Sequence, residues 1–247
     1  MDGLAALTRS EARLFLRDRG QVFFVLVLPV LLVLGFGSVP DIRAASPDFD
    51  GAVPLDALIA PIGIAILLAV TAYNVVPAHV VSYRERGVLR RLSASPVRAS
   101  TMLGAVLLVK VVAAFVGVLL VLLLGALLVG LSMPAQPLGF ALVFVLATVA
   151  LLSLGMLVAA RVRTAGSATA TGMLLFFPSM FVAGVYVPRE QLPSWLGRLG
   201  EVTPLGAALQ GFRDTWTGSM PSLLQIGALV VWSAVLSVVA ARTFRWE

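Results

Sequence analysis

Few residues of this chain could take part in catalysis or metal binding. It contains one histidine, His79, and no cysteine, so the sequence excludes a multi-histidine metal centre, thiolate chemistry and disulfides. A serine hydrolase would have to pair His79 with a serine such as Ser132, which follows Gly130 in a loose G-x-S-x motif. The apolar runs around these two residues predict opposite ends of their helices, about 30 Å apart across a bilayer. An intramembrane serine protease is therefore the weaker alternative.

The charged residues also limit how the chain could drive transport. All twelve acids lie in flanks or loops rather than inside apolar runs, although Asp56 borders one. Ion- or proton-coupled secondary transporters usually carry an intramembrane carboxylate, so this alternative is disfavoured, although backbone carbonyls could substitute. A nucleotide-binding P-loop needs Gly-Lys-Ser/Thr, whereas the only lysine, Lys110, follows Val109. We expect Lys110 to reach back to the membrane surface, and any ATP that drives transport to be hydrolysed by a separate subunit.

The elements that hold these residues are predicted from hydropathy. The chain is 60% hydrophobic and 12% charged, with a mean hydropathy of +1.01, whereas soluble domains contain roughly 25% charged residues. A helix crosses a bilayer with about 20 mostly apolar residues. We predict an all-α polytopic membrane protein, a single transmembrane domain over residues 1–247. Its six spans are expected at 22–39, 57–81, 102–131, 138–160, 168–187 and 221–241.

The arginines predict the orientation of these spans. With the N-terminus inside the cell, thirteen arginines fall in cytoplasmic segments and four in outside loops, which agrees with the positive-inside rule. Both termini are therefore predicted to be cytoplasmic. Seventeen arginines against one lysine also hint at a GC-rich bacterial genome. We accordingly expect a multi-pass protein of a bacterial cytoplasmic membrane.

Two further patterns lie within or beside the spans. Residues 4–19 are amphipathic, with Arg9, Arg13 and Arg17 recurring every four residues on one face, as in a helix that lies in the membrane interface. Thr71 and Asn74 stand three residues apart on one face of the second span. Such a polar stripe either joins helices through hydrogen bonds or lines a transport path. The sequence leaves both interpretations open.

Two segments resemble the permease subunits of type-2 ABC exporters, and the six-span order extends the resemblance to nearly the whole chain. The first segment is RERGVLRRLSASPVR, residues 84–98, which follows the family pattern R-E-x-G-x-x-x-x-L-x-x-x-P-V at Arg84, Glu85, Gly87, Leu92, Pro96 and Val97. The second, residues 176–213, matches the family's late signature, although Ala183 replaces the usual serine and residues 206–207 replace a common Thr-Tyr. The matching positions are Gly184, Pro188, Leu192, Pro193, Trp195, Pro204, Leu205 and Arg213.

The resemblance implies that residues 84–98 form a cytoplasmic coupling helix between spans 2 and 3, seated in a cleft of the ATPase subunit. Its implied contact residues are Arg84, Glu85, Gly87, Val88, Leu89, Arg90, Leu92 and Pro96. Taken alone, the same arginines would also suit a lipid anchor at the inner surface. Prolines bracket two short helices between spans 5 and 6, which in the family re-enter the outer membrane face and cap the translocation path. The implied gate residues are Pro188, Leu192, Pro193, Trp195 and Pro204.

The resemblance also implies the partners. In this family two permeases and two ATPase subunits make one transporter, so ATP and Mg bind the ATPase subunit, and this chain is expected to bind no cofactor, metal or nucleic acid. A second copy of this permease, or a related one, is expected to meet it through spans 1 and 5. Small residues on span 5 would let the backbones approach there; they are Gly166, Ala168, Ala170 and Gly172. The implied substrate is an apolar or amphipathic drug, antibiotic or lipid.

Overall fold

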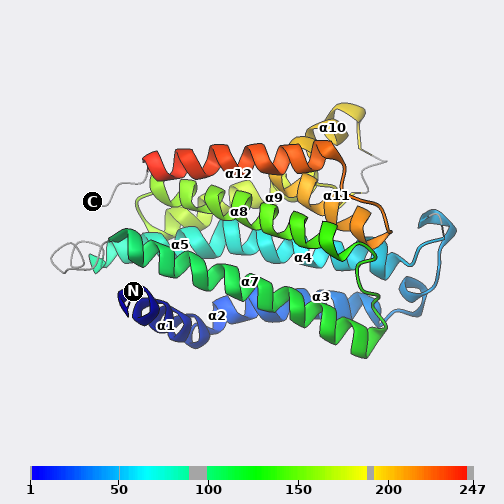
Figure 1. The fold of residues 1–247 in the computed structure, drawn as a ribbon, viewed down its shortest axis with the longest axis horizontal. Coiled ribbons are helices and arrows are strands. Elements are labelled where there is room, and N and C mark those ends of the chain that lie inside the picture. Colours follow the sequence, from blue (N-terminus) through cyan, green and yellow to red (C-terminus); the bar gives the residue numbers. More distant parts are fainter. Residues whose placement is uncertain (1, 50, 89–98, 188–191, 244–247) are drawn as a thin grey trace.

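The architecture is an elongated bundle of helices (Figure 1). The computed structural model describes residues 2–49, 51–88, 99–187 and 192–243, and the regular structure in these residues is entirely helical. Six helical stretches among them are long and apolar enough to cross a membrane. These stretches are Arg19–Gly37, Leu55–Glu85, Thr101–Val129, Pro137–Arg161, Ala165–Val182 and Leu223–Thr243. The predicted all-α fold with six candidate spans is confirmed.

The first two spans are each built from several helical segments. Span 1 comprises α2 (Arg19–Val22), η1 (Phe23–Val27) and α3 (Leu28–Gly37). Span 2 comprises η4 (Leu55–Ile59), α4 (Ala60–Val70), η5 (Thr71–Val75) and α5 (Val76–Glu85). The other spans are the single helices α7 (Ala99–Val129), α8 (Pro137–Arg161), α9 (Ala165–Val182) and α12 (Leu223–Thr243). Outside the spans lie α1 (Asp2–Arg17), η2 (Pro40–Arg43), η3 (Pro47–Phe49), α10 (Ser194–Val202) and α11 (Pro204–Trp216).

Both termini lie at one end of the bundle, which we call the terminal end (Figure 1). Helices α5 and α8 end there, and α7 and α9 begin there. The loop between α3 and η4, the turn between α7 and α8, and the helices α10 and α11 lie towards the opposite end, which we call the loop end. The spans thus alternate in direction, as six crossings with both termini on one side require.

Span 2 forms the centre of the bundle. In its most apolar stretch 72% of the residues are buried, against 17% in α9 and 22% in α12. Span 1, α7, α8, α9 and α11 all pack against it. Outward-facing leucines on the surrounding elements are largely exposed, including Leu127 at 71% and Leu174 at 74%. An extended apolar surface of this kind suits a bundle surrounded by lipid.

Three prolines explain why the first two spans are segmented. Pro29, Pro61 and Pro77 each lie two residues after the end of a π-helical segment, namely η1, η4 and η5. A proline has no N–H to donate, and its ring collides with the carbonyl four residues earlier. In all three segments the residue before the proline donates its N–H to the carbonyl five residues back. The π turn is wider than an α turn, so the carbonyl four residues before the proline is moved away from the proline ring. This carbonyl then lacks the backbone N–H donor that a regular α-helix would supply.

Each of these three carbonyls is approached by another helix. The carbonyls belong to Val25, Ala57 and Tyr73. Arg213 of α11 donates its Nε–H to the Ala57 oxygen over 3.2 Å. Glycines face the other two: a Cβ at Gly117 would lie 3.0 Å from the Val25 oxygen, and a Cβ at Gly172 would be closer than 3.0 Å to the Tyr73 oxygen. The missing side chains allow α7 and α9 to pack directly on the spans' backbones.

Helix α9 differs in two ways from the predicted span at 168–187. It begins at Ala165 and ends at Val182, because Gly184 takes a left-handed φ of 84° just beyond it. Its small residues also face in different directions.

Of these small residues, Ala168 is fully buried and Gly172 packs on Tyr73 of η5. The prediction that Ala168 and Gly172 contact a second permease is therefore wrong, because both are buried inside their own chain. The other two members of the set, Gly166 and Ala170, remain exposed. The four residues alternate along the sequence, so a helix with 3.6 residues per turn cannot present them all on one face.

Candidate functional site

Helix α1 packs against α7 at the terminal end. Its arginines Arg9, Arg13 and Arg17 are all exposed, as their helical spacing predicts. On the opposite side Glu11 and Phe15 are each 4% exposed. A carboxylate buried on the apolar face of a helix needs hydrogen-bond partners, and the structure supplies them from span 2.

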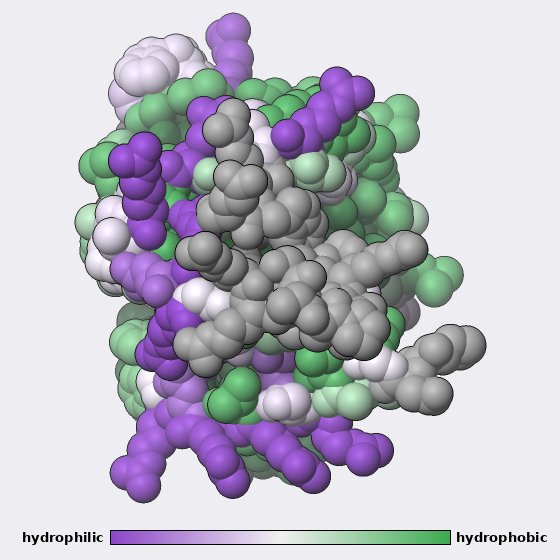
Figure 2. All heavy atoms as spheres, turned by 90° about the vertical axis from the view of Figure 1, so that its left-hand side faces the viewer, coloured by the Kyte–Doolittle hydropathy of each residue, from purple (hydrophilic) through white to green (hydrophobic). Residues whose placement is uncertain are grey.

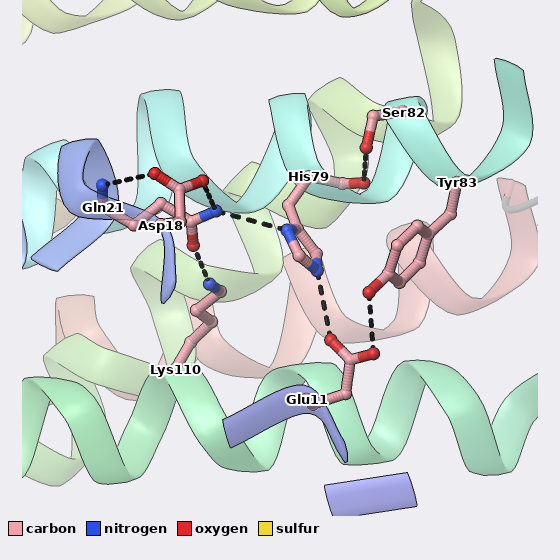
Figure 3. A network of polar contacts seen from close by, with 7 residues as sticks. All are labelled: Glu11, Asp18, Gln21, His79, Ser82, Tyr83 and Lys110. Atoms are coloured by element: carbon pink, nitrogen blue, oxygen red, sulfur yellow. Dashed lines mark hydrogen bonds and ion pairs between the residues drawn. The ribbon is translucent and has the colours of Figure 1, made fainter. Parts of the chain in front are cut away.

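Glu11 joins α1 to α5 through both of its carboxylate oxygens (Figure 3). The Tyr83 hydroxyl donates to Oε1 over 2.7 Å, and Nε2 of His79 lies 3.1 Å from Oε2. Burial raises the pKa of Glu11. The hydrogen bonds from His79 and Tyr83 and the nearby positive charges together lower this pKa by more than burial raises it, so the net shift is downward. Glu11 is therefore held as a carboxylate between two side chains of span 2.

Gln21 extends this network from span 1 to α7 (Figure 3). Its Nε2 donates to Oδ2 of Asp18 over 2.7 Å and lies 3.4 Å from Nδ1 of His79. Its Oε1 accepts a hydrogen bond from the Lys110 ammonium, which also lies 4.8 Å from the centre of the Phe15 ring. Lys110 is only 1% exposed, so the prediction that it reaches back to the membrane surface is wrong. The Gln21 oxygen and the Phe15 ring stabilise its charge inside the bundle.

We call these residues the terminal-end network: Glu11, Asp18, Gln21, His79, Tyr83 and Lys110. It connects α1, span 1, span 2 and α7. Sequence reasoning missed it, because Glu11 and Asp18 interrupt an amphipathic pattern without forming any short motif. The signal that could have found it is chemical: Glu11 on an apolar face, and a lone histidine and a lone lysine inside spans, each require a polar partner.

Span 2 ends beside this network, where the predicted coupling segment begins. Helix α5 stops at Glu85, and Gly87 reverses the chain with a φ of 67°, which favours glycine. The Arg84 guanidinium donates to the carbonyl of Val162, the residue after α8. Glu85 is exposed, and Val88 is half-buried against the core. The first residues of the segment are thus fixed to both span 2 and α8.

Several predicted site residues lie outside the part of the chain that the structure describes. They are Leu89, Arg90, Leu92 and Pro96 of the coupling segment and Pro188 of the outside gate. The predicted gate residue Leu192 is described and is half-buried.

Figure 2 looks onto the terminal end, where many of the described side chains are hydrophilic, whereas hydrophobic side chains cover much of the flanks. A polar end and apolar flanks suit contact with water or a soluble protein at the end and with lipid at the sides.

At the loop end the chain forms the two short helices that the prolines predict. Pro193 immediately precedes α10, and Pro204 is the first residue of α11. Thr203 lies between them, and its hydroxyl accepts from the Gly206 N–H over 3.3 Å to cap α11. The two helices differ in burial. Trp195 of α10 is 67% exposed, whereas α11 packs against α4, α8 and α12.

Three contacts fix α11 and the neighbouring turn. Arg213 donates to the free Ala57 carbonyl of η4. Trp216 is buried, and its Nε1–H donates to the Ser132 carbonyl over 3.0 Å. Ser132 is held in turn by Asp56, whose carboxylate accepts from the Ser132 N–H over 3.1 Å and from its hydroxyl over 2.6 Å. These bonds join α11 to the start of span 2 and to the turn before α8.

These positions exclude the pairing of Ser132 with His79 that the serine-hydrolase alternative would use. Ser132 lies at the loop end and donates its hydroxyl to Asp56, whereas His79 lies at the terminal end beside Glu11. A nucleophilic serine and its base must be within hydrogen-bond reach of each other. Within the described ranges there is also no group of three or more histidine, aspartate or glutamate side chains that could hold a metal ion.

The polar pair on span 2 is packed among helices. Thr71 is fully buried, and its hydroxyl donates to the Leu67 carbonyl over 2.7 Å. Asn74 is half-buried, and its Oδ1 has no hydrogen-bond partner among the residues that the structure describes. A Cβ at Gly172 would lie 3.0 Å from that oxygen. The Thr71 hydroxyl therefore has a hydrogen-bond acceptor in its own helix, whereas the Asn74 oxygen still needs a donor.

The fold and the site define a class: a multi-pass membrane protein. The polar contacts of the described residues at both ends of span 2 join helices to one another. A family model described as ABC-2 type transporter matches residues 3–216. The chain belongs to this family and is the membrane component of an ABC transporter, which in this family implies an ABC ATPase as partner. The resemblance to the permease subunits of type-2 ABC transporters is thereby confirmed. A search of curated proteins found no match to the chain.

Proposed function

We propose that this chain is the permease of an ATP-driven exporter that moves an apolar or amphipathic substrate, such as a drug, an antibiotic or a lipid. The family match over residues 3–216 carries the proposal, together with the lack of a P-loop sequence in the chain. ATP and Mg bind the separate ATPase subunit, and two permeases form one path. The membrane is the bacterial cytoplasmic membrane, and the terminal end faces the cytoplasm.

Coupling to the ATPase takes place where span 2 ends. The segment of residues 84–98 binds the ATPase, and Glu85 pairs with a basic residue of that subunit. The exposure of Glu85 supports this role. Arg84 transmits the movement of the coupling segment to α8 through its hydrogen bond to the Val162 carbonyl. Glu11 transmits it to α1 through Tyr83. The proposal is supported by the burial of span 2, because the central helix cannot move without its neighbours.

Span 2 also links the ATPase to the outside gate. It is one helical stretch from Leu55 to Glu85, with π segments at η4 and η5 where the regular hydrogen bonding is interrupted. Such segments are common at functional sites and allow a helix to bend. Arg213 attaches α11 directly to η4. A displacement of span 2 therefore moves α11, and with it the gate formed by α10 and α11.

The test of coupling compares substitutions of the expected ATPase-contact residues with substitutions of two neighbouring arginines. Leu89→Asp and Leu92→Asp would bury an unpaired charge in the ATPase cleft, at about 3–5 kcal/mol, and Glu85→Arg would reverse the expected ion pair. We expect these variants to insert normally but to lose ATPase co-purification or ATP-dependent export. The matched variant Arg90→Gln with Arg91→Gln should affect insertion more than export if the arginines anchor lipid. If all three coupling variants export at the wild-type rate, the segment serves only as a lipid anchor.

Orientation is tested separately by labelling single cysteines in whole cells. Ser194 is the first residue of α10, which lies towards the loop end, and Gly166 lies in the first turn of α9, which begins at the terminal end. Both positions are exposed, and each is changed to cysteine. A membrane-impermeant maleimide should label the first from outside and should leave the second unlabelled until the cells are opened. Labelling of Gly166→Cys in intact cells would reverse the proposed topology.

A further inference from the structure

A groove between α7, α8 and α12 opens on the apolar side of the bundle. Its volume is about 540 Å³, within the ~300–1,000 Å³ typical of small-molecule sites. Its walls are mainly aliphatic and include Leu103 and Leu107 of α7, Leu152 and Met156 of α8, and Ala240 of α12. None of the residues that line the groove belongs to the predicted coupling segment or gate, and neither role explains it.

The chemistry of the groove suits a hydrocarbon chain. Its two polar side chains, Ser153 and Ser237, lie with their hydroxyl oxygens 2.8 Å apart and bond each other across α8 and α12. The groove therefore presents no polar group that requires a polar ligand. A Cβ at Gly104 would meet no atom within 4 Å, so the space above this glycine is open.

A second cavity at the terminal end is basic. It has a volume of about 600 Å³ and is lined by Arg84, Arg161 and Arg163, by one acid, Glu85, and by neighbours that include Thr243. Arg84 is already bound to a carbonyl oxygen. Arg161 and Arg163 are exposed, and within the described part of the chain neither forms an ion pair. The cavity thus carries net positive charge and two available guanidinium groups.

The groove and the basic cavity are lined by neighbouring turns of the same two helices. On α8, Met156 lines the groove and Ala160 lines the cavity; they are one helical turn apart on the same face, about 6 Å along the axis. On α12, Ala240 lines the groove and Thr243 lines the cavity. The apolar groove therefore lies about one helical turn from a cationic cavity at the ends of α8 and α12.

We propose that the groove and the cavity together bind one anionic phospholipid. An acyl chain lies in the groove, and the headgroup phosphate binds Arg161 and Arg163. Basic pockets between transmembrane helices bind anionic headgroups, and guanidinium groups match phosphate geometry. A docked ATPase would explain the arginines but not the apolar groove one helical turn from their cavity. The site holds a resident lipid whatever substrate the transporter carries.

The test measures lipid binding to the purified full-length protein in detergent by native mass spectrometry, with phosphatidylglycerol and phosphatidylcholine of identical acyl chains as probes. Arg161→Gln with Arg163→Gln should weaken phosphatidylglycerol binding by about 25-fold, since each basic residue contributes about fivefold. Phosphatidylcholine binding should weaken much less, because its choline cation offsets the phosphate charge. Gly104→Leu fills the groove and should weaken both lipids. The matched controls are Arg43→Gln with Arg198→Gln, which removes equal charge at the loop end, and Gly227→Leu, an exposed glycine of α12 with no atom within 4 Å of its Cβ position.

Two results would overturn the proposal. One is unchanged phosphatidylglycerol affinity in either site variant. The other is an equal loss in the charge control, which would show general attraction to the protein's net charge. If the double arginine variant keeps its lipid but loses the ATPase subunit, the arginines belong to the ATPase interface and the lipid site is wrong. Gly104→Leu should fold, because it adds a better helix former at an open position.

Discussion

The contact between α9 and span 2 predicts a large effect for one methyl group. Gly172→Ala would place a Cβ closer than 3.0 Å to the Tyr73 carbonyl oxygen, a distance that Cβ atoms essentially never reach. The opposing atom belongs to the backbone, so no side chain can rotate away, and α9 must move outwards by about 1 Å at a cost of about 1–3 kcal/mol. Alanine also favours helix by about 1 kcal/mol relative to glycine, which partly masks the clash.

The control variant isolates the clash. Gly227→Ala, in α12, gains the same helix propensity but meets no atom within 4 Å, so the difference between the two variants is the packing cost alone. Thermal unfolding in detergent should show a lower midpoint for Gly172→Ala, by about 2–4 °C for each kcal/mol. Tryptophan fluorescence reports the transition, because Trp216 is buried. Equal midpoints would refute the close packing of α9 on the Tyr73 carbonyl.

Two further predictions concern the two ends of span 2. Arg213→Gln leaves the Ala57 carbonyl without its donor and should cost about 1–3 kcal/mol in a thermal unfolding assay, whereas Arg198→Gln on the exposed face of α10 should stay within about 0.5 kcal/mol of wild type. Glu11 has a folded-state pKa below its ordinary value of 4.5. Its carboxylate therefore stabilises the fold above the unfolded-state pKa and loses that effect as the pH falls through the lowered folded-state pKa. Glu11→Gln should flatten the acid limb of a stability-versus-pH curve, and an unchanged acid limb would contradict the network.

Hydropathy was sufficient to predict the number and order of the spans, because each span is a long apolar run and a bilayer tolerates little else. The prolines were sufficient to predict the short helices at the loop end, since Pro193 and Pro204 restrict where a helix begins. Both signals are local. Each can be recognised from neighbouring residues without knowing what packs against them.

The remaining features depend on contacts between distant segments. Lys110 and Gln21 are 89 residues apart in sequence, so hydropathy predicted an exposed ammonium where the fold provides a buried acceptor. Ala168 and Gly172 are small enough to pack either against a second permease or against another helix of their own chain. Only the packing of α9 on η5 shows which of these contacts they make. The π segments follow from prolines visible in the sequence, but their use as contact points depends on Arg213, Gly117 and Gly172.

The buried charges at the terminal end are better explained as fixing geometry than as adding stability. Removing Glu11 and Lys110 from water is costly, and apolar residues of similar volume often stabilise a core at least as well. Apolar packing has no direction, however, and would allow α1 to slide along α7. The bond from Tyr83 to Glu11 is directional and holds α1 in one register on span 2. Because α5 ends two residues after Tyr83, a shift of α1 would also reorient the start of the proposed coupling segment.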